Sequence, residues 1–216
     1  MRRGLIWGLL WAVAVAGRAE VIDRVAVTVD KIVITESDII HQIRVAAFLN
    51  EEPVDVSPKA RREAARRLVE QVLIRREMEI SRYPAPAPPE VEPLLQQVKQ
   101  NRFPDEKSFR AALARYRITE AELRQSLLLQ LTTVRFIDYR FRPGVAVSDE
   151  EIGEYYQKEF LPEWRRRGSG APPPLEDTRE QIEQILISRQ VNQALDKWLR
   201  QAAAGARIEY REAAFQ

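Results

Sequence analysis

Residues 175–204 read LEDTREQIEQILISRQVNQALDKWLRQAAA, a stretch without glycine or proline. Such a composition predicts one long helix, and Gly205 is placed to end it. Its apolar residues fall largely on one side at helical spacing: Ile182, Ile185, Leu195, Trp198, Leu199 and Ala202. An apolar stripe must be buried, so we expect this helix to cross back and pack against helices that lie earlier in the chain.

The segment immediately before it, residues 162–174 (PEWRRRGSGAPPP), has no apolar periodicity and is rich in proline and glycine. This composition predicts a linker. We therefore expect a helical core over residues 20–161, a linker over 162–174, and a tail over 175–216 that completes the same domain.

Short strands are predicted at both ends of this core. Residues 25–29 alternate in the period-two pattern of a strand, and residues 32–34 form a second apolar run after Asp30-Lys31, which predicts a hairpin. Residues 208–210 are a third alternating run. This last strand could pair with residues 25–29 and cover an exposed edge.

The remainder of the core is predicted to be helical, so the expected fold class is mainly α with a small sheet. Cap-type residues mark several helix starts: Thr35 or Ser37, Ser57 before Pro58, Thr119 with Glu122, and Ser148 with Glu151. The expected helices cover about residues 38–50, 58–82, 90–102, 106–117, 120–141 and 149–160. The proline-rich residues 83–89 cannot continue a helix and predict a stiff connector.

The first residues have the pattern of an export signal. Arg2 and Arg3 precede the apolar run 5–16, which is too short to span a membrane. We expect a signal peptide over residues 1–19, cleaved before Gly17 or Glu20, a periplasmic location, and no stable membrane insertion afterwards. The alternative is an uncleaved N-terminal anchor.

Charge and cysteine content exclude several classes of function. The chain has 34 Lys+Arg and 32 Asp+Glu, and loss of Arg2 and Arg3 leaves 32 of each. Without a positive surplus, binding to nucleic acid is not expected. The absence of cysteine removes disulfides and zinc-thiolate sites.

No constellation of catalytic residues is recognisable, so we expect no enzyme, no cofactor and no metal. The one histidine, His41, lies in a predicted helix and is interpreted as a structural or surface residue. The acidic pairs Glu51-Glu52 and Glu150-Glu151 fall at loop or cap positions and are weak evidence for catalysis. Glu150-Glu151 in particular suits the positive end of a helix.

A helical protein of this kind can bind apolar segments of other chains between its helices. The candidates for such peptide binding are Phe103, Phe109, Leu113 and Tyr116. The alternative, which the helical spacing favours, is that these four residues are ordinary core.

Several segments make the chain resemble the SurA family of periplasmic chaperones, which also contains peptidyl-prolyl isomerases. The resemblance covers most of residues 22–160 and also the end of the chain. It is carried by IDRVAV (22–27) with IVITESDI (32–39), LVEQVLI (68–74), VSDEEI (147–152) with Tyr155-Tyr156, ALDKWL (194–199) and ARIEY (206–210).

The resemblance implies an ATP-independent holdase that binds unfolded outer-membrane proteins in a cradle formed by the N-terminal helices and the returning C-terminal helix. Family members usually carry parvulin-type isomerase domains where this chain has only residues 162–174, so no catalytic residue is carried over. Two alternatives remain: an isomerase-related protein, and a structural or adaptor protein that uses the same groove for one folded partner or for a second copy of itself.

Overall fold

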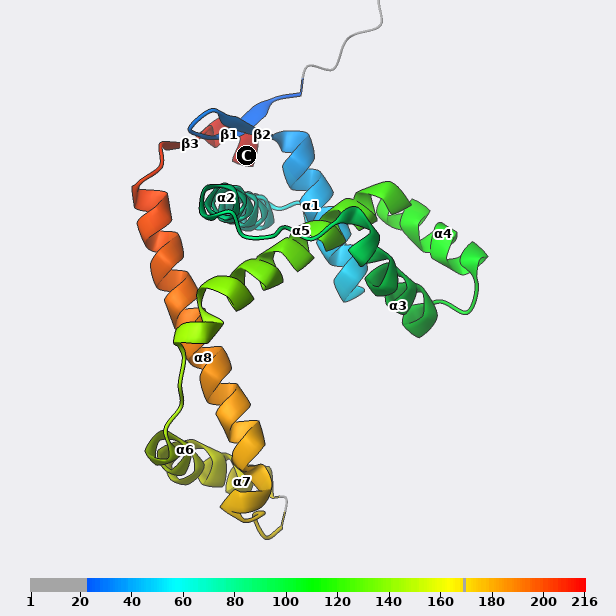
Figure 1. Ribbon diagram of the computed structural model, residues 1–216. Coiled ribbons are helices and arrows are strands. Elements are labelled where there is room, and N and C mark those ends of the chain that lie inside the picture. Colours follow the sequence, from blue (N-terminus) through cyan, green and yellow to red (C-terminus); the bar gives the residue numbers. More distant parts are fainter. Residues whose placement is uncertain (1–22, 169) are drawn as a thin grey trace, which may run out of the picture.

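The computed structural model describes residues 23–168 and 170–216 and is mainly helical, as expected (Figure 1). The predicted signal peptide, its cleavage positions and Ile22 lie outside the described residues. The helices are α1 Glu36–Asn50, α2 Pro58–Ser81, α3 Glu92–Arg102, α4 Glu106–Tyr116, α5 Glu120–Arg140, α6 Asp149–Tyr155, α7 Leu161–Arg167 and α8 Leu175–Ala204. The strands are β1 Val25–Val29, β2 Ile32–Thr35 and β3 Ile208–Tyr210.

Short turns join or follow some of these elements. Three are 3-10 turns, at Pro88–Val91, Arg142–Gly144 and Glu212–Phe215. A π-helical turn, Tyr156–Phe160, connects α6 to α7 without a break.

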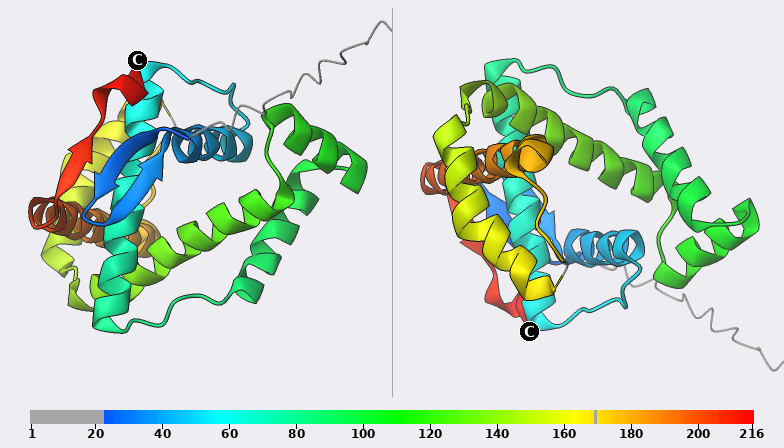
Figure 2. Two further views of the ribbon diagram at one scale, coloured as in Figure 1. Left: turned by 90° about the horizontal axis from the view of Figure 1, so that it is seen from above. Right: turned by 90° about the horizontal axis from the view of Figure 1, so that it is seen from below.

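The three strands form one antiparallel sheet with the order β2-β1-β3. Thr28 of β1 lies between Val33 of β2 and Glu209 of β3. The hairpin and the pairing of the last strand with the first are therefore confirmed. The sheet lies over α2, and the two ends of the described chain meet there (Figure 2).

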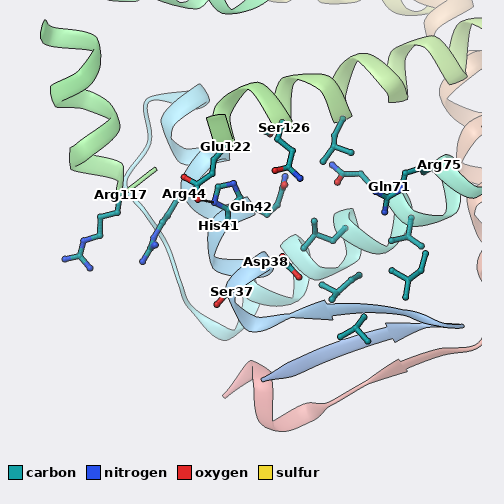
Figure 3. Close-up of a pocket in the computed structure, with 17 residues that line it drawn as sticks. Ser37, Asp38, His41, Gln42, Arg44, Gln71, Arg75, Arg117, Glu122 and Ser126 are labelled. Atoms are coloured by element: carbon teal, nitrogen blue, oxygen red, sulfur yellow. Dashed lines mark ion pairs between the residues drawn. The ribbon is translucent and has the colours of Figure 1, made fainter. Parts of the chain in front are cut away.

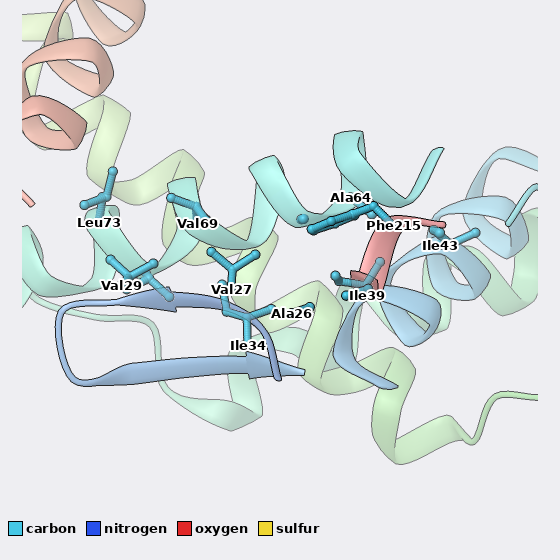
Figure 4. Close-up of a cluster of buried hydrophobic side chains, with 13 residues drawn as sticks. Ala26, Val27, Val29, Ile34, Ile39, Ile43, Ala64, Val69, Leu73 and Phe215 are labelled. Atoms are coloured by element: carbon cyan, nitrogen blue, oxygen red, sulfur yellow. The ribbon is translucent and has the colours of Figure 1, made fainter. Parts of the chain in front are cut away.

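The core beneath the sheet is built from the inner-facing residues of the strands and one face of α2 (Figure 4). Val27 and Val29 are buried, and they pack in the same cluster as Val69 of α2. Phe215 is only 1% exposed and lies between α1 and α2. Burying a side chain of this size contributes about 1.5 to 3 kcal/mol, which fixes the end of the chain against the sheet.

The predicted helix starts are confirmed by their hydrogen bonds. The side chains of Thr35, Thr119 and Ser148 each accept a hydrogen bond from the backbone N–H three residues later, in complete capping boxes. Ser57 accepts from the N–H of Ala60. These bonds satisfy amides that would otherwise have no partner inside the helix.

The linker predicted over residues 162–174 is wrong for its first half, because α7 continues to Arg167. Pro162 directly follows the π-helical turn, in which the regular bonding between residues four apart is already interrupted. Glu163 forms an ion pair with Arg167, 3.0 Å between Oε1 and Nε. Gly168 then ends the helix with φ of 66°, so only residues 168–174 connect α7 to α8.

Helix α8 has the predicted bounds and returns to the earlier helices, as expected. Near its start, Ile182 and Leu186 pack on Ile152 of α6. Near its end, Trp198 packs against a cluster that contains Phe136 of α5. Helix α8 thus runs from the sheet to α6 and α7, whereas α3 and α4 project from the opposite side of the molecule (Figure 1).

Candidate functional site

The four peptide-binding candidates lie in a hydrophobic cluster between α1, α3, α4 and α5. Phe109, Leu113 and Tyr116 are buried, and Phe103 is partly buried against them. The ring of Phe48 on α1 stacks on Phe103 at 5.9 Å between centroids and meets Tyr116 edge-on at 5.6 Å. These residues fill a core in this structure, and their contact with a peptide stays a prediction.

An open groove of about 770 Å³ lies beside this cluster, between α1, α2, α3 and α5. We call it the amide groove because six carboxamide side chains line it: Gln42, Asn50, Gln71, Gln97, Asn101 and Gln130. Its apolar lining is Ala46, Leu49, Ile74, Leu94, Val98, Leu127 and Val134. None of the four sequence-predicted residues lines it.

The lining follows from helical spacing within each element. On α1, Gln42, Ala46 and Asn50 are four residues apart, and on α3 Gln97 and Asn101 have the same spacing. Residues four apart share one face of a helix, so each helix presents a mixed stripe of amides and apolar groups to the groove. The stripes from four helices face the same space.

Two of the three charged residues that line the groove, Glu70 and Arg102, form ion pairs. Glu70 pairs with Arg66 at 2.9 Å between Oε1 and Nη1. Arg102 lies 3.5 Å from Glu51, and it also donates to the carbonyl of Leu49. Arg67 is the third charged residue, so the lining is mainly uncharged and carries one further cation. A carboxamide both donates and accepts hydrogen bonds, which matches the N–H and C=O groups of a peptide backbone.

A second cavity, of about 550 Å³, lies between β2, α1, α2 and the start of α5 (Figure 3). We call it the β2 cavity. Ile32, Val33 and Ile34 of β2 line one side of it. Gln42 and Gln71 line both this cavity and the amide groove, so the two spaces adjoin along these side chains.

His41 lies in the β2 cavity and contacts a capping box. Its Nδ1 is 3.4 Å from Oε1 of Glu122. The other carboxylate oxygen of Glu122 accepts hydrogen bonds from the backbone N–H of Thr119 at 2.6 Å and from its hydroxyl at 2.8 Å. These bonds, led by the one from the Thr119 amide, lower the pKa of Glu122. The contact gives both residues a structural role.

Glu151, from one of the acidic pairs, has the same role at the start of α6. The backbone N–H and hydroxyl of Ser148 hold its carboxylate and lower its pKa. Its other oxygen accepts from Gln190 of α8 at 2.9 Å. Over residues 23–168 and 170–216, no three His, Asp or Glu side chains are grouped as metal ligands.

No helix in the described part of the chain combines the length and apolar character needed to cross a bilayer. No protein-family model matches the sequence, and no curated protein matches it either. The fold and the two cavities thus define a mainly helical protein whose chief chemical feature is an open groove of apolar and carboxamide groups.

Sequence reasoning missed the amide groove. Glutamine and asparagine are common on exposed helix surfaces, so Gln42 and Asn50 on α1 and the amides of α3 do not stand out. A local signal existed in the spacing of Gln97 and Asn101 beside Leu94 and Val98, which mixes amides and apolar residues on one face.

Proposed function

We propose that this protein is an ATP-independent chaperone that holds unfolded outer-membrane proteins in the periplasm, and that the amide groove is its contact surface. The observation that carries the proposal is the lining of this groove. Apolar side chains there can take up apolar side chains of an unfolded chain, and the carboxamides can bond to its backbone. Neither contact requires a particular client sequence.

The affinity expected for such a groove is modest. Each backbone hydrogen bond contributes about 0.5 to 1.5 kcal/mol net, and apolar burial adds about 25 cal/mol for each Å². Association costs about 4 to 15 kcal/mol, so this cost and the favourable free energy of the contacts are of similar size. Weak, reversible binding is what a holdase needs, because the client must leave without ATP hydrolysis.

The periplasmic location and the class of client rest on the predicted signal peptide and on the resemblance to SurA-type chaperones. The proposal includes no catalytic step. In this chain α7 is joined to α8 by residues 168–174 alone. The family that the chain resembles usually carries an isomerase domain in this region.

Aggregation of a denatured outer-membrane barrel, diluted from urea and followed by light scattering, tests the proposal. We expect the purified chain, in several-fold molar excess, to suppress aggregation of several unrelated barrels. No suppression of any barrel would contradict the proposal. Tight stoichiometric binding of a single folded partner, without an effect on aggregation, would instead identify an adaptor.

A further inference from the structure

Strand β2 forms one edge of the sheet and β3 the other. The outward backbone groups of the free edge of β2 can be assigned from the register. The N–H of Asp30 donates to the carbonyl of Arg207, 2.8 Å, so this position of the chain bonds toward β3. Bonding direction alternates along an antiparallel strand, so Val29 bonds toward its partner Ile32 in β2. The next residue of β2, Val33, therefore directs its N–H and C=O away from β1, toward the open edge.

This edge strand contains no charged residue and no proline. Edge strands are normally shielded by charged residues or proline. Strand β2 reads Ile-Val-Ile-Thr, and Val33 is 50% exposed. By contrast, β3 at the opposite edge carries Glu209 between Arg207 and Arg211.

A strand added beside β2 would have the β2 cavity on one of its faces and solvent on the other. Ile34 shares the inner face of the sheet, next to Leu68 and Leu129 in the cavity lining. Val33 shares the outer face with Thr28, which is turned away from the core. A strand added here would meet apolar side chains on one face and solvent on the other. Its own residues would therefore alternate between apolar and polar.

The charges around the cavity favour an acidic ligand. Arg44 and Arg117 lie at one end of the cavity and Arg75 at the other (Figure 3). The cavity's carboxylates, Asp38 and Glu122, are already engaged in the capping boxes of α1 and α5. These carboxylates keep their negative charge, so three guanidinium groups against two carboxylates leave the lining with a positive balance of one.

We propose that the free edge of β2, together with the β2 cavity, binds an extended client segment by strand addition, and that this segment alternates apolar and polar residues and carries acidic flanks. Alternation of this kind is the pattern of a strand from a membrane-spanning β-barrel. The inference rests on the proposed function and names the part of the client that is held. The remainder of the segment can continue past Gln42 and Gln71 into the amide groove.

Site-specific photo-crosslinking to a denatured outer-membrane barrel tests this inference. The photoreactive p-benzoylphenylalanine would replace Val33 at the free edge, Tyr210 on β3 as the matched control, or Val134 in the amide groove. These side chains are 50%, 42% and 53% exposed, so each site tolerates the change. We expect crosslinks from Val33 and Val134 but not from Tyr210.

The outcomes separate the two proposals. Crosslinks from Val134 alone would overturn strand addition and leave the chaperone function intact. Crosslinks from none of the three sites would overturn both, and equal crosslinking from Val33 and Tyr210 would overturn the preference for β2.

Synthetic peptides supply a second readout that needs no change in the protein. The probe is a peptide of alternating valine and threonine with aspartate at both ends, measured by fluorescence anisotropy. Methylating alternate backbone nitrogens along one edge removes donors from that edge, and we expect this to weaken binding at least about tenfold. Equal affinity of the methylated and unmethylated peptides would overturn strand addition, as would preference for a peptide with lysine flanks.

Discussion

The ring of Phe136 on α5 lies 4.8 Å from the ring of Trp198 on α8, centroid to centroid. Phe136 is fully buried, and Phe141 meets it edge-on at 5.5 Å. This contact fixes the second half of α8 against the helices that precede the connector. The same helix, α5, forms one wall of the amide groove, and Phe136 lies in the turns next to that wall. The contact between Phe136 and Trp198 therefore helps to hold the groove wall in place.

Replacing Phe136 with alanine should destabilise the protein by about 3 to 5 kcal/mol, since it leaves a cavity where a buried ring was. Urea unfolding measures the change in the free energy of unfolding. In limited proteolysis, α8 should be cut after a shorter digestion time in the variant than in the unchanged protein. The control is Ile80→Ala on α2, where the side chain is 67% exposed. It should change the free energy of unfolding by no more than about 0.5 kcal/mol.

Replacing Thr119 with alanine should cost about 1 kcal/mol, because α5 loses the side chain that accepts from the Glu122 amide. The matched control is Thr132→Ala within α5, whose hydroxyl donates to the Leu128 carbonyl in the same helix. Alanine favours helix, so this control should leave stability equal or slightly higher. Equal loss in both variants would show that the cap has no specific role.

Stability should fall in acid. Hydrogen bonds from Arg135 and Arg189 lower the pKa values of Glu90 and Glu159 below their usual 4.5. Near these pKa values the folded state thus binds fewer protons than the unfolded state. The stabilisation is present above about pH 4.5 and is lost as the pH falls through the lowered pKa values of the folded state. Urea midpoints at pH 7, 5.5 and 3.5 measure this. We expect the main decrease below pH 4.5, and 1 M salt should reduce it because these pairs are exposed.

Replacing groove carboxamides with carboxylates should weaken client binding. Gln97→Glu or Gln130→Glu removes two N–H donors from the groove and adds a charge, so we expect the dissociation constant of an unfolded barrel to rise about 2- to 12-fold for each lost hydrogen bond. Gln193→Glu on α8, outside the groove, is the matched control and should leave affinity unchanged. Equal effects at all three sites would indicate a general charge effect.

Much of the fold could be predicted from local patterns. The bounds of α8 and β1 follow from composition and alternation, and Thr119 and Ser148 mark their helix starts through hydrogen bonds between residues close in sequence. The composition of residues 162–174 predicts a linker, but residues 162–167 are helical, because Pro162 follows a π-helical turn in which the regular helical bonding is already interrupted. Local signals are reliable where the interaction itself is local.

The candidate site could not be predicted in the same way. Phe109 and Tyr116 have the spacing of either a groove or a core, and only the contact with Phe48 from another helix decides between them. The amide groove takes its lining from four helices, so no single stretch of sequence contains it. Its residues become neighbours only when α3 and α5 pack beside α1 and α2.

The affinity of an unfolded outer-membrane barrel for a matched pair of variants tests the role of the amide groove most directly. Val134→Glu places a charge in the groove at a side chain that is 53% exposed, and Ile80→Glu places the same charge on an aliphatic position of α2 that is 67% exposed and lies outside both cavities. We predict that Val134→Glu raises the dissociation constant about tenfold or more, because a carboxylate disfavours burial of an apolar client segment. Ile80→Glu should leave the dissociation constant unchanged. Unchanged affinity in both variants would contradict the account.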